Sequence, residues 1–467
     1  MLETWAADEM RHLDLGDARL NRRVATLVEA LAAKPSASVP EACGTWAATK
    51  GAYRLWDGPA GTAAAIRAAH VARTAERARA HGRVLVIQDT TDLDVTHHPK
   101  TSGVGPPDHP RHRGLKVHSG LAATPDGVPL GLVHQQVWAR DPDDLGQRHQ
   151  RRDRATAEKE SQRWLDALVA SQAAVPAAVR VLTVADREAD IFDLFALPRR
   201  PGSELLIRAT HDRRLVADAP DEAAAEAARL WATARAAPAL GTLTIRGPRA
   251  DDRPARAATL TLRVAAVAVA PPRHRRGRAK LAPVPLRAVL AAEEEAPAGG
   301  ATPLCWLLLT TVPVDGFAAA VECVRWYKIR WLIERYHYVL KSGCHLEELR
   351  LETAARLECA LATYCLVTWR LLWLTYAARH DPDAPCDGAL AAHEWQALAC
   401  TMLRTPVPPP EPPPLRQAVR WIAQLGGFLG RTHDGEPGGQ TIWRGLRRLD
   451  GIAATWLLLH SPPPGPT

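Results

Sequence analysis

The hydrophobic pattern predicts helices at the start of the chain. Between residues 18 and 33, apolar side chains recur at helical spacing, and Asp17 stands before them as a candidate N-cap. A second helical stretch covers residues 41–56, and Pro35 and Pro40 separate the two. We therefore expect residues 1–70 to form a helical domain.

From residue 83 onward the pattern changes to short strands. Residues 84–87 and 181–185 are apolar, β-branched runs typical of buried strands, and we expect them to end at Asp89 and Asp186. Further strands are expected at 115–123, 128–139 and 205–208, with a charged helix at 151–171. These elements predict the first part of an α/β core over residues 71–210.

The second half of the chain alternates again between strands and helices. A β-rich insertion is expected at 211–311, from alternating segments at 242–246, 259–269 and 304–311, and it contains a basic run at 273–280. Helical periodicity returns at 316–341 and predicts that the core resumes over 312–375. We expect residues 376–467 to form a helical C-terminal domain with a proline-rich linker and tail.

Composition sets limits on the class of protein. The chain has 467 residues, 46% of them hydrophobic and 24% charged, which fits a globular protein of several domains. Its net charge of +8 is compatible with a polyanionic partner without requiring one. Eight cysteines without CxxC pairing argue against a zinc ribbon or a disulfide framework. With neither a secretory signal nor a long apolar run in view, we expect a soluble, intracellular protein without membrane contact.

The two strand-end aspartates are the first chemical signal. If their strands are neighbours, Asp89 and Asp186 converge at one edge of a sheet, where two carboxylates repel unless a divalent cation lies between them. Taken singly, each also has an ordinary structural role. Asp89 can cap a turn, and Asp186 can cap the helix that follows it.

A second signal lies in the predicted helix at 316–341. On a helical wheel, one narrow polar face carries Tyr327, Arg330, Glu334 and Lys341. A solvated helix with an Arg330–Glu334 ion pair is the simple alternative. However, three carboxylates supply the all-oxygen ligands that Mg²⁺ prefers, and the neighbouring cations suit phosphate oxygens. Together the residues favour phosphoryl chemistry on nucleic acid.

These motifs resemble those of the bacterial DDE transposases of the insertion-sequence-four family, the group that contains the transposon-five transposase. Residues 86–93 resemble its first-aspartate motif, and residues 186–190 its second. Its third motif, with Y-(2)-R-(3)-E-(6)-K spacing, matches Tyr327, Arg330, Glu334 and Lys341. Residues 15–19 and 51–54 also resemble the DNA-binding region of that family.

The resemblance implies a fold and a cofactor. The fold is α/β, a ribonuclease-H-like mixed-sheet core with a β-rich insertion, flanked by helical N- and C-terminal domains. Asp89, Asp186 and Glu334 would be the catalytic residues and would bind two Mg²⁺ ions, which Mn²⁺ can replace. The implied partners are double-stranded DNA, both transposon ends and target, and a second copy of the chain in a paired-end homodimer. The implied location is the bacterial cytoplasm, at the nucleoid.

The resemblance also implies DNA contacts. Phosphates near the cleavage point would be held by Tyr327, Arg330 and Lys341, and Arg208 would add another contact. Trp306 would receive a base flipped out of the duplex, although packing in the core is its alternative role. Tyr338 stands where the transposon-five enzyme has a lysine. At the N-terminus, the candidate contacts to the inverted terminal repeats are Arg19, Arg22, Arg23, Lys50 and Arg54.

The implied function is cut-and-paste DNA transposition by two-metal phosphoryl transfer. It comprises strand nicking, hairpin formation and resolution, and strand transfer. Two alternatives stay open on sequence alone. One is a metal-dependent DNA endonuclease without strand transfer, and the other is a domesticated DNA-binding protein. The three intact carboxylates count against the second alternative.

Overall fold

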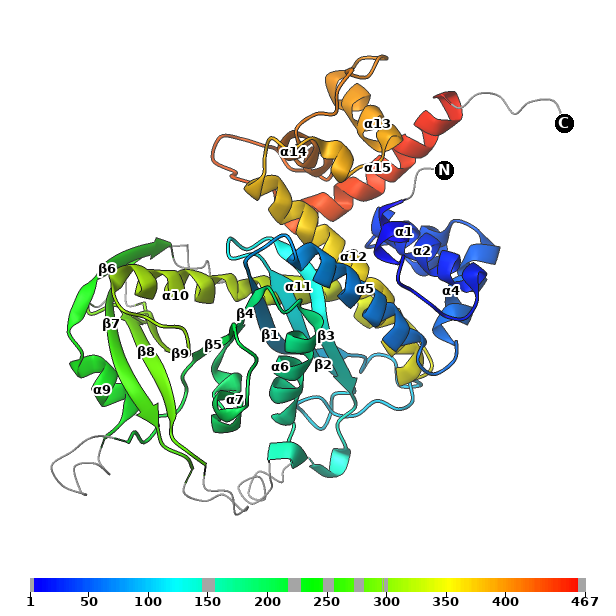
Figure 1. Cartoon of the computed structure of the whole chain (residues 1–467). Coiled ribbons are helices and arrows are strands. Elements are labelled where there is room, and N and C mark those ends of the chain that lie inside the picture. The colour runs from blue at the N-terminus through cyan, green and yellow to red at the C-terminus, as the bar shows by residue number, and fades with distance from the viewer. Residues whose placement is uncertain are drawn as a thin grey trace.

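The structure is a computed structural model that describes residues 4–144, 156–216, 228–246, 256–272, 281–295, 297 and 301–460. Figure 1 shows a sheet through the middle of the molecule, the N-terminal helices on one side of it and the C-terminal helices above. The basic run at 273–280 and the proline-rich tail from 461 lie outside the described residues.

Five helices form the N-terminal part: α1 (Trp5–Glu9), α2 (Ala18–Ala33), α3 (Val39–Cys43), α4 (Trp46–Trp56) and α5 (Thr62–Ala78). The prediction of α2 is confirmed, and the Asp17 carboxylate accepts the Arg19 backbone N–H at 2.7 Å as its N-cap. The single helix predicted at 41–56 is wrong. Gly44 adopts a left-handed conformation with φ 71°, which ends α3, and Thr45 caps α4 separately.

Nine strands form one mixed sheet in the order β3-β2-β1-β4-β5-β9-β8-β7-β6. Their bounds are β1 (Arg83–Asp94), β2 (Gly114–Ala123), β3 (Pro129–Trp138), β4 (Arg180–Ala185), β5 (Ser203–Arg208), β6 (Ala239–Arg246), β7 (Ala257–Val269), β8 (Val284–Ala292) and β9 (Cys305–Thr310). Strands β1, β4 and β5 run parallel, and every other pairing is antiparallel. The expected mixed α/β core is therefore confirmed.

The β-rich insertion continues the core sheet. Strand β9 pairs with β5, placing Leu309 opposite Ile207, and β8, β7 and β6 follow outward from it. Strand β8 did not stand out in the sequence, because Pro285 and Arg287 interrupt its apolar run. The insertion strands thus share one hydrogen-bonded frame with the strands that carry the aspartates.

Two predicted boundaries in the core are wrong. Strand β1 continues past Asp89 to Asp94, because β2 pairs with it along its whole second half. The charged helix expected at 151–171 begins later, as α6 (Gln162–Ala174), and residues 145–155 lie outside the described residues.

Helices cover both faces of the sheet, because alternate residues of each strand point to opposite sides. On one face, α6, α7 (Phe192–Ala196) and α9 (Leu230–Ala236) pack on residues such as Leu205 and Ile207. The other face is covered by the N-terminal helices together with α10 (Phe317–Ile329), α11 (Trp331–Tyr338) and α12 (Ala354–His380). Helix α12 is long and apolar enough to span a membrane, but 83% of its most apolar window is buried inside the protein. It serves here as the central core helix.

The helix predicted at 316–341 is confirmed, since α10 and α11 are joined by Arg330, whose own backbone is right-handed helical (φ −48°, ψ −34°). Its hydrogen bonding is irregular at Arg330, and after Tyr338 it continues as a π-helical turn over Val339–Gly343. The four residues of the third motif therefore come from three consecutive helical pieces. π-turns are frequently found at functional sites.

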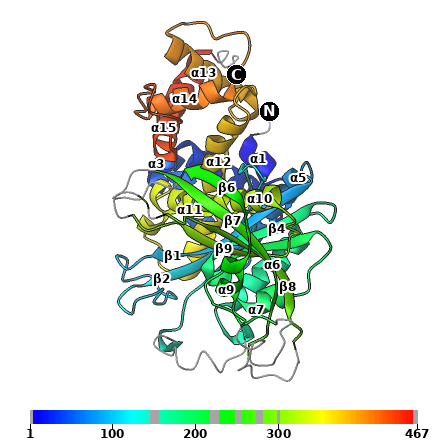
Figure 2. The same cartoon turned by 90° about the vertical axis from the view of Figure 1, so that its left-hand side faces the viewer.

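The C-terminal helices form a separate small core. Helices α13 (Ala392–Leu403), α14 (Leu415–Leu425) and α15 (Gly439–His460) pack on each other and on the end of α12. Figure 2 shows them standing above the sheet. Helix α15 also reaches the N-terminal helices, because Arg447 pairs with Glu41 and Asp450 lies 3.0 Å from Lys34.

Candidate active site

The register of two parallel strands places the two aspartates side by side. Ile87 of β1 pairs with Val184 of β4, and this is the last pair of that ladder. Asp89 and Asp186 each lie two residues beyond it, so they occupy matching positions at the same edge of the parallel ladder. The expected convergence of the two aspartates therefore follows from the observed pairing.

Local backbone groups hold each carboxylate. The Asp89 Oδ1 accepts the backbone N–H of Thr90 at 2.8 Å. The Asp186 Oδ1 accepts the backbone N–H of Glu188 at 3.1 Å, where Asp186 begins a short 3₁₀ turn. The ordinary capping role considered for Asp186 is thus present. In each aspartate the backbone N–H is bound by Oδ1, and Oδ2 takes no part in that hydrogen bond.

Glu334 comes to the same region on α11, which packs against β1. Its carboxylate receives a hydrogen bond from Arg330 Nη2 at 2.6 Å, so the alternative i,i+4 ion pair is also present. The Arg330 side chain is only 12% exposed, and its guanidinium lies 5.7 Å from the centre of the Tyr327 ring. Arg330 therefore lies inside the site and not on a solvated helix face.

The three acids influence one another. Burial, together with the negative charges of Asp186 and Glu334, raises the pKa of Asp89 to about 7 against the opposing effect of Arg330. Within the described part of the chain, no three such side chains are gathered into a ready-made metal cluster. The all-oxygen donor set and the excess negative charge around Asp89 nevertheless fit a divalent cation such as Mg²⁺. Glu334 would have to leave Arg330 to join it.

A histidine that the sequence reasoning missed also borders Asp89. The Nδ1 of His337 lies 4.0 Å from Asp89 Oδ2. Burial lowers the pKa of His337 to about 3, so the ring is neutral. Its spacing of three residues from Glu334, one helical turn, was the signal that could have found it.

The phosphate-contact candidates of the third motif lie in different surroundings. The Lys341 Nζ lies in the π-turn, 3.4 Å from Glu347 Oε1. Tyr327 is only 4% exposed, and because the Arg330 guanidinium lies 5.7 Å from its ring, the two share one helix face that is turned into the protein. Among the described residues its hydroxyl has no hydrogen-bond partner. Tyr338 is 44% exposed and packs near Trp443 of α15.

Trp306 and Arg208 approach the site from the sheet. Trp306, on β9, makes an edge contact with the Tyr327 ring at 5.4 Å between centroids. It is half-buried, so it packs on the core and still has an accessible part. Arg208, the last residue of β5, donates to the Cys305 carbonyl oxygen at 3.3 Å. The structure thus brings Trp306 to α10, against Tyr327 of the third motif, which its distance along the chain did not require.

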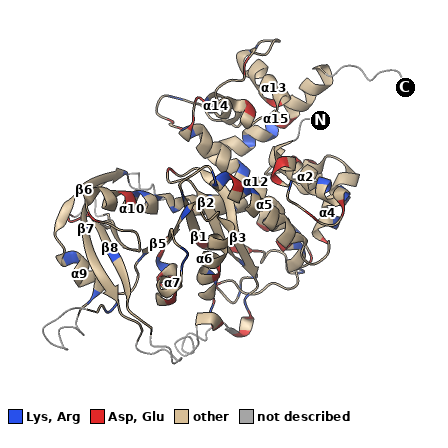
Figure 3. Ribbon diagram, in the orientation of Figure 1, with Lys and Arg blue, Asp and Glu red and all other residues tan. Residues whose placement is uncertain are grey.

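The N-terminal cations lie elsewhere. All five are exposed, on α2 and α4, which pack against each other: Arg19, Arg22, Arg23, Lys50 and Arg54. Figure 3 shows Lys and Arg positions on these two helices, at the side of the molecule away from the insertion strands. The sequence reasoning missed Trp46 at the start of α4, whose side chain is 77% exposed beside these cations.

Three family models match this chain in succession. A transposase DNA-binding model matches residues 2–61, a transposase DDE domain model matches residues 135–370, and a transposase Tn5 dimerisation domain model matches residues 366–455. The DDE match covers half of the chain and includes Asp186 and Glu334. It begins after Asp89, whose assignment rests on its pairing position beside Asp186.

Proposed function

Since this chain belongs to the Tn5-type DDE transposases, DNA-binding enzymes that cleave DNA and transfer its strands, we propose that Asp89, Asp186 and Glu334 form its catalytic centre. The observation that supports this most directly is the matched position of the two aspartates beyond the β1–β4 ladder, with α11 packed against β1. Its macromolecular partners are DNA and a second copy of the chain.

The DDE family uses a divalent metal, and we propose two Mg²⁺ ions, replaceable by Mn²⁺, held by the three carboxylates. When bound, they would activate the attacking oxygen and stabilise the leaving one. Arg330 then has two roles in turn. It pairs with Glu334 before metal binding, and afterwards its guanidinium is free for a phosphate oxygen of the DNA.

The remaining side chains of the site supply DNA contacts. Tyr327 and Lys341 would bind phosphates near the cleavage point. Arg208, at the end of β5, would add another contact to the DNA. Trp306 would stack on a flipped base, since its ring already lies against Tyr327 at the site. Stacking on the indole would offset part of the unstacking cost, about a few kcal/mol.

The exposed faces of α2 and α4 would recognise the inverted terminal repeats of the element. Five cations there are placed for phosphates or base edges, as named above, and Trp46 adds an exposed aromatic side chain to the same surface. We also propose that the chain is divided into domains after residues 70, 210, 311 and 375. We place the protein in the bacterial cytoplasm, at the nucleoid.

The proposed reaction proceeds in four steps within a paired-end dimer. Hydrolysis nicks one strand at the end of the element, and the freed 3′-hydroxyl attacks the opposite strand to give a hairpin. Water reopens the hairpin, and the same 3′-hydroxyl then attacks target DNA. Each step breaks one P–O bond of a phosphodiester and forms one P–O bond to water or to the 3′-hydroxyl, so a single set of carboxylates serves all four.

Incubation of the protein with Mg²⁺ and DNA carrying the ends of its element tests this proposal. We expect nicked, hairpin, excised and strand-transfer products, all lost in Asp89→Ala, Asp186→Ala and Glu334→Ala. Cleavage without joining of a pre-cleaved end would instead favour the endonuclease. Biological activity that survives all three substitutions would favour a DNA-binding protein without catalysis.

A further inference from the structure

Arg163, the second residue of α6, contacts both aspartate motifs. Its Nε donates to the Thr90 hydroxyl at 3.0 Å, and its Nη2 donates to the Glu188 carboxylate at 3.0 Å. Thr90 directly follows Asp89, and Glu188 lies two residues after Asp186. One guanidinium therefore spans the two segments that carry the catalytic aspartates.

The two residues that Arg163 holds are also the residues that hold the carboxylates. The backbone N–H of Thr90 binds Asp89 Oδ1, and the backbone N–H of Glu188 binds Asp186 Oδ1. Arg163 is thus linked to the Asp89 carboxylate through Thr90 and to the Asp186 carboxylate through Glu188. A shift of the guanidinium would displace both backbone donors.

The surroundings hold Arg163 in place. Its side chain is only 11% exposed, and its Nη1 donates to the carbonyl oxygen of Glu160 at 2.9 Å. The rings of Trp138 and Trp164 lie 5.5 and 5.8 Å from the guanidinium carbon. Because the guanidinium is planar and its donors are fixed in direction, these contacts define one orientation.

The Thr90 side chain has a second hydrogen-bond partner besides Arg163. Its hydroxyl lies 2.9 Å from Nδ1 of His118, which is fully buried on β2. Burial lowers the pKa of His118 well below its usual value, so Nδ1 of a neutral ring can accept the Thr90 proton. Thr90 can therefore accept from Arg163 and donate to His118 at the same time.

We infer that Arg163 is a positioning residue that sets the spacing of the Asp89 and Asp186 carboxylates for the divalent metal. The inference rests on the proposed catalytic role of these aspartates. A residue that orients the ligands of a metal typically contributes about 10- to 100-fold to metal affinity. Lysine has one nitrogen where arginine has a planar group of three, so it cannot reproduce the separate Nε and Nη2 contacts in a fixed geometry.

Direct Mn²⁺ binding to the DNA-free protein, measured by electron paramagnetic resonance of the free ion, tests this role apart from turnover. We expect Arg163→Met to weaken Mn²⁺ binding about 10- to 100-fold and to raise by a similar factor the Mg²⁺ concentration needed for half-maximal nicking. Arg163→Lys should recover little of either. End-DNA binding without metal should be unchanged.

Arg140 supplies the matched control. It is 10% exposed and binds the Glu160 carboxylate, but it contacts neither Thr90 nor Glu188. Arg140→Met should lower the melting temperature and leave the Mn²⁺ affinity unchanged. Equal effects of Arg140→Met and Arg163→Met on Mn²⁺ affinity, or no effect of Arg163→Met, would overturn the positioning role.

Two milder variants cover the case in which Arg163→Met does not fold. Glu188→Ala, at a side chain that is 62% exposed, and Thr90→Ala each remove one contact, and each should weaken Mn²⁺ binding less than Asp186→Asn. Unchanged Mn²⁺ binding in both would count against the inference. If the wild-type protein binds no Mn²⁺ at all, the proposed catalytic centre itself is wrong.

Discussion

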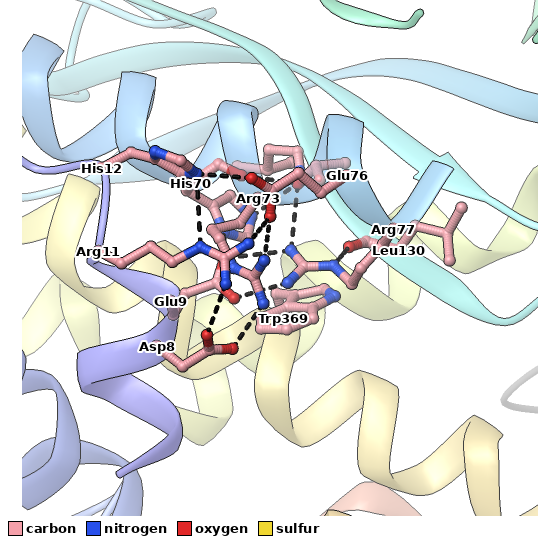
Figure 4. A network of polar contacts seen from close by, with 12 residues as sticks. Asp8, Glu9, Arg11, His12, His70, Arg73, Glu76, Arg77, Leu130 and Trp369 are labelled. Carbon is pink, nitrogen blue, oxygen red and sulfur yellow. Dashed lines mark hydrogen bonds and ion pairs between the residues drawn. The ribbon is translucent and has the colours of Figure 1, made fainter. Parts of the chain in front are cut away.

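Two buried clusters of charged side chains in this protein have carboxylates whose pKa values shift in opposite directions. One is the Asp89–Asp186–Glu334 site with Arg330. The other joins α1, α5, β3 and α12 and has Glu9 at its centre (Figure 4). Burial raises the pKa of Asp89, and the negative charges of Asp186 and Glu334 raise it further, to about 7. Burial acts on Glu9 too, but His70 and Arg77 outweigh it and lower the pKa of Glu9 to about 2.

The Glu9 cluster is complete in itself. Glu9 binds His70 Nδ1 at 2.5 Å and Arg77 Nη1 at 2.6 Å. Arg77 Nε also donates to the Leu130 carbonyl oxygen, and His70 Nε2 accepts the Leu132 backbone N–H. His70 is therefore a neutral ring with its proton on Nδ1. Every charge here meets a partner, which is typical of a structural connection between the N-terminal helices and the core.

The proposed catalytic cluster is incomplete by comparison. Among the described residues, Arg330 is the one guanidinium hydrogen-bonded to any of its three carboxylates, that of Glu334, and burial with the neighbouring acids raises the pKa of Asp89. Carboxylates whose pKa is shifted by like charges are typical of sites that await a cation or a substrate. The difference teaches that burial alone does not mark a functional acid; the balance of neighbouring charges does.

Asp89→Asn should have the largest effect on activity and the smallest cost to folding. We expect strand nicking to fall by at least about 10³-fold, since a charged ligand of the catalytic site is lost. The melting temperature should stay level or rise, because the neutral amide removes repulsion from Asp186 and Glu334. Nicking assays and thermal unfolding measure both. A large drop in melting temperature would make Asp89 a structural residue like Glu9.

Arg77→Met should break the Glu9 cluster. It leaves Glu9 buried without its cation, which costs about 3–5 kcal/mol of unfolding free energy. Urea unfolding measures this. The control is Arg11→Met, at a side chain 43% exposed that pairs with Asp8, where we expect less than about 1 kcal/mol. Similar losses of unfolding free energy in Arg77→Met and Arg11→Met would show that burial of the Glu9–Arg77 pair does not raise the cost of breaking it.

Acid should weaken the Glu9 cluster in two stages. The unfolded chain protonates His70 near its ordinary pKa of 6.5, while burial lowers the pKa of His70 in the fold, so stability falls as pH drops below that value. The ionised Glu9 contributes stability above its ordinary pKa of 4.5, and this is lost as pH falls toward about 2. Melting temperatures of the wild type and His70→Gln measured across this range should differ in the first stage. Parallel curves would contradict the assignment.

Arg330→Ala should give the smallest shift and sharpen the contrast with Arg77. We expect it to weaken cleavage, and we expect the slope of log binding constant against log salt to become shallower by about 0.9, one phosphate contact. Arg356→Ala, at a partly buried side chain already paired with Asp57, should leave the slope unchanged. An unchanged slope for Arg330→Ala would remove its phosphate role.

Local patterns predicted much of the fold correctly. The Asp17 cap, the helix after it and the buried strands before both aspartates all depend on neighbouring residues, so periodicity and residue type were sufficient. The irregular hydrogen bonding of the helix at 316–341 was not predictable in this way. Its apolar residues continue at helical spacing past Arg330 and into the π-turn at Val339–Gly343, so the spacing marks neither feature.

One glycine illustrates the same limit. Gly131 has φ 139°, and a Cβ there would lie 2.0 Å from the Thr74 hydroxyl oxygen. It lies between Leu130 and Leu132, whose backbone groups bind Arg77 and His70. A glycine in a strand often marks a bulge. The close approach of α5 to β3, which leaves no room for a Cβ at Gly131, is visible only in the folded structure.

The amino-acid sequence alone determined the order of the motifs, the acids that carry the proposed chemistry and most of the helices and strands, because each follows from residue types within a few positions. Tertiary structure alone decided three other features. The insertion continues the core sheet, Arg163 spans two motifs from a third segment, and Glu9 meets His70 across more than sixty residues. Strand register and side-chain contacts between distant segments depend on which surfaces pack together, and local periodicity carries no information about that choice.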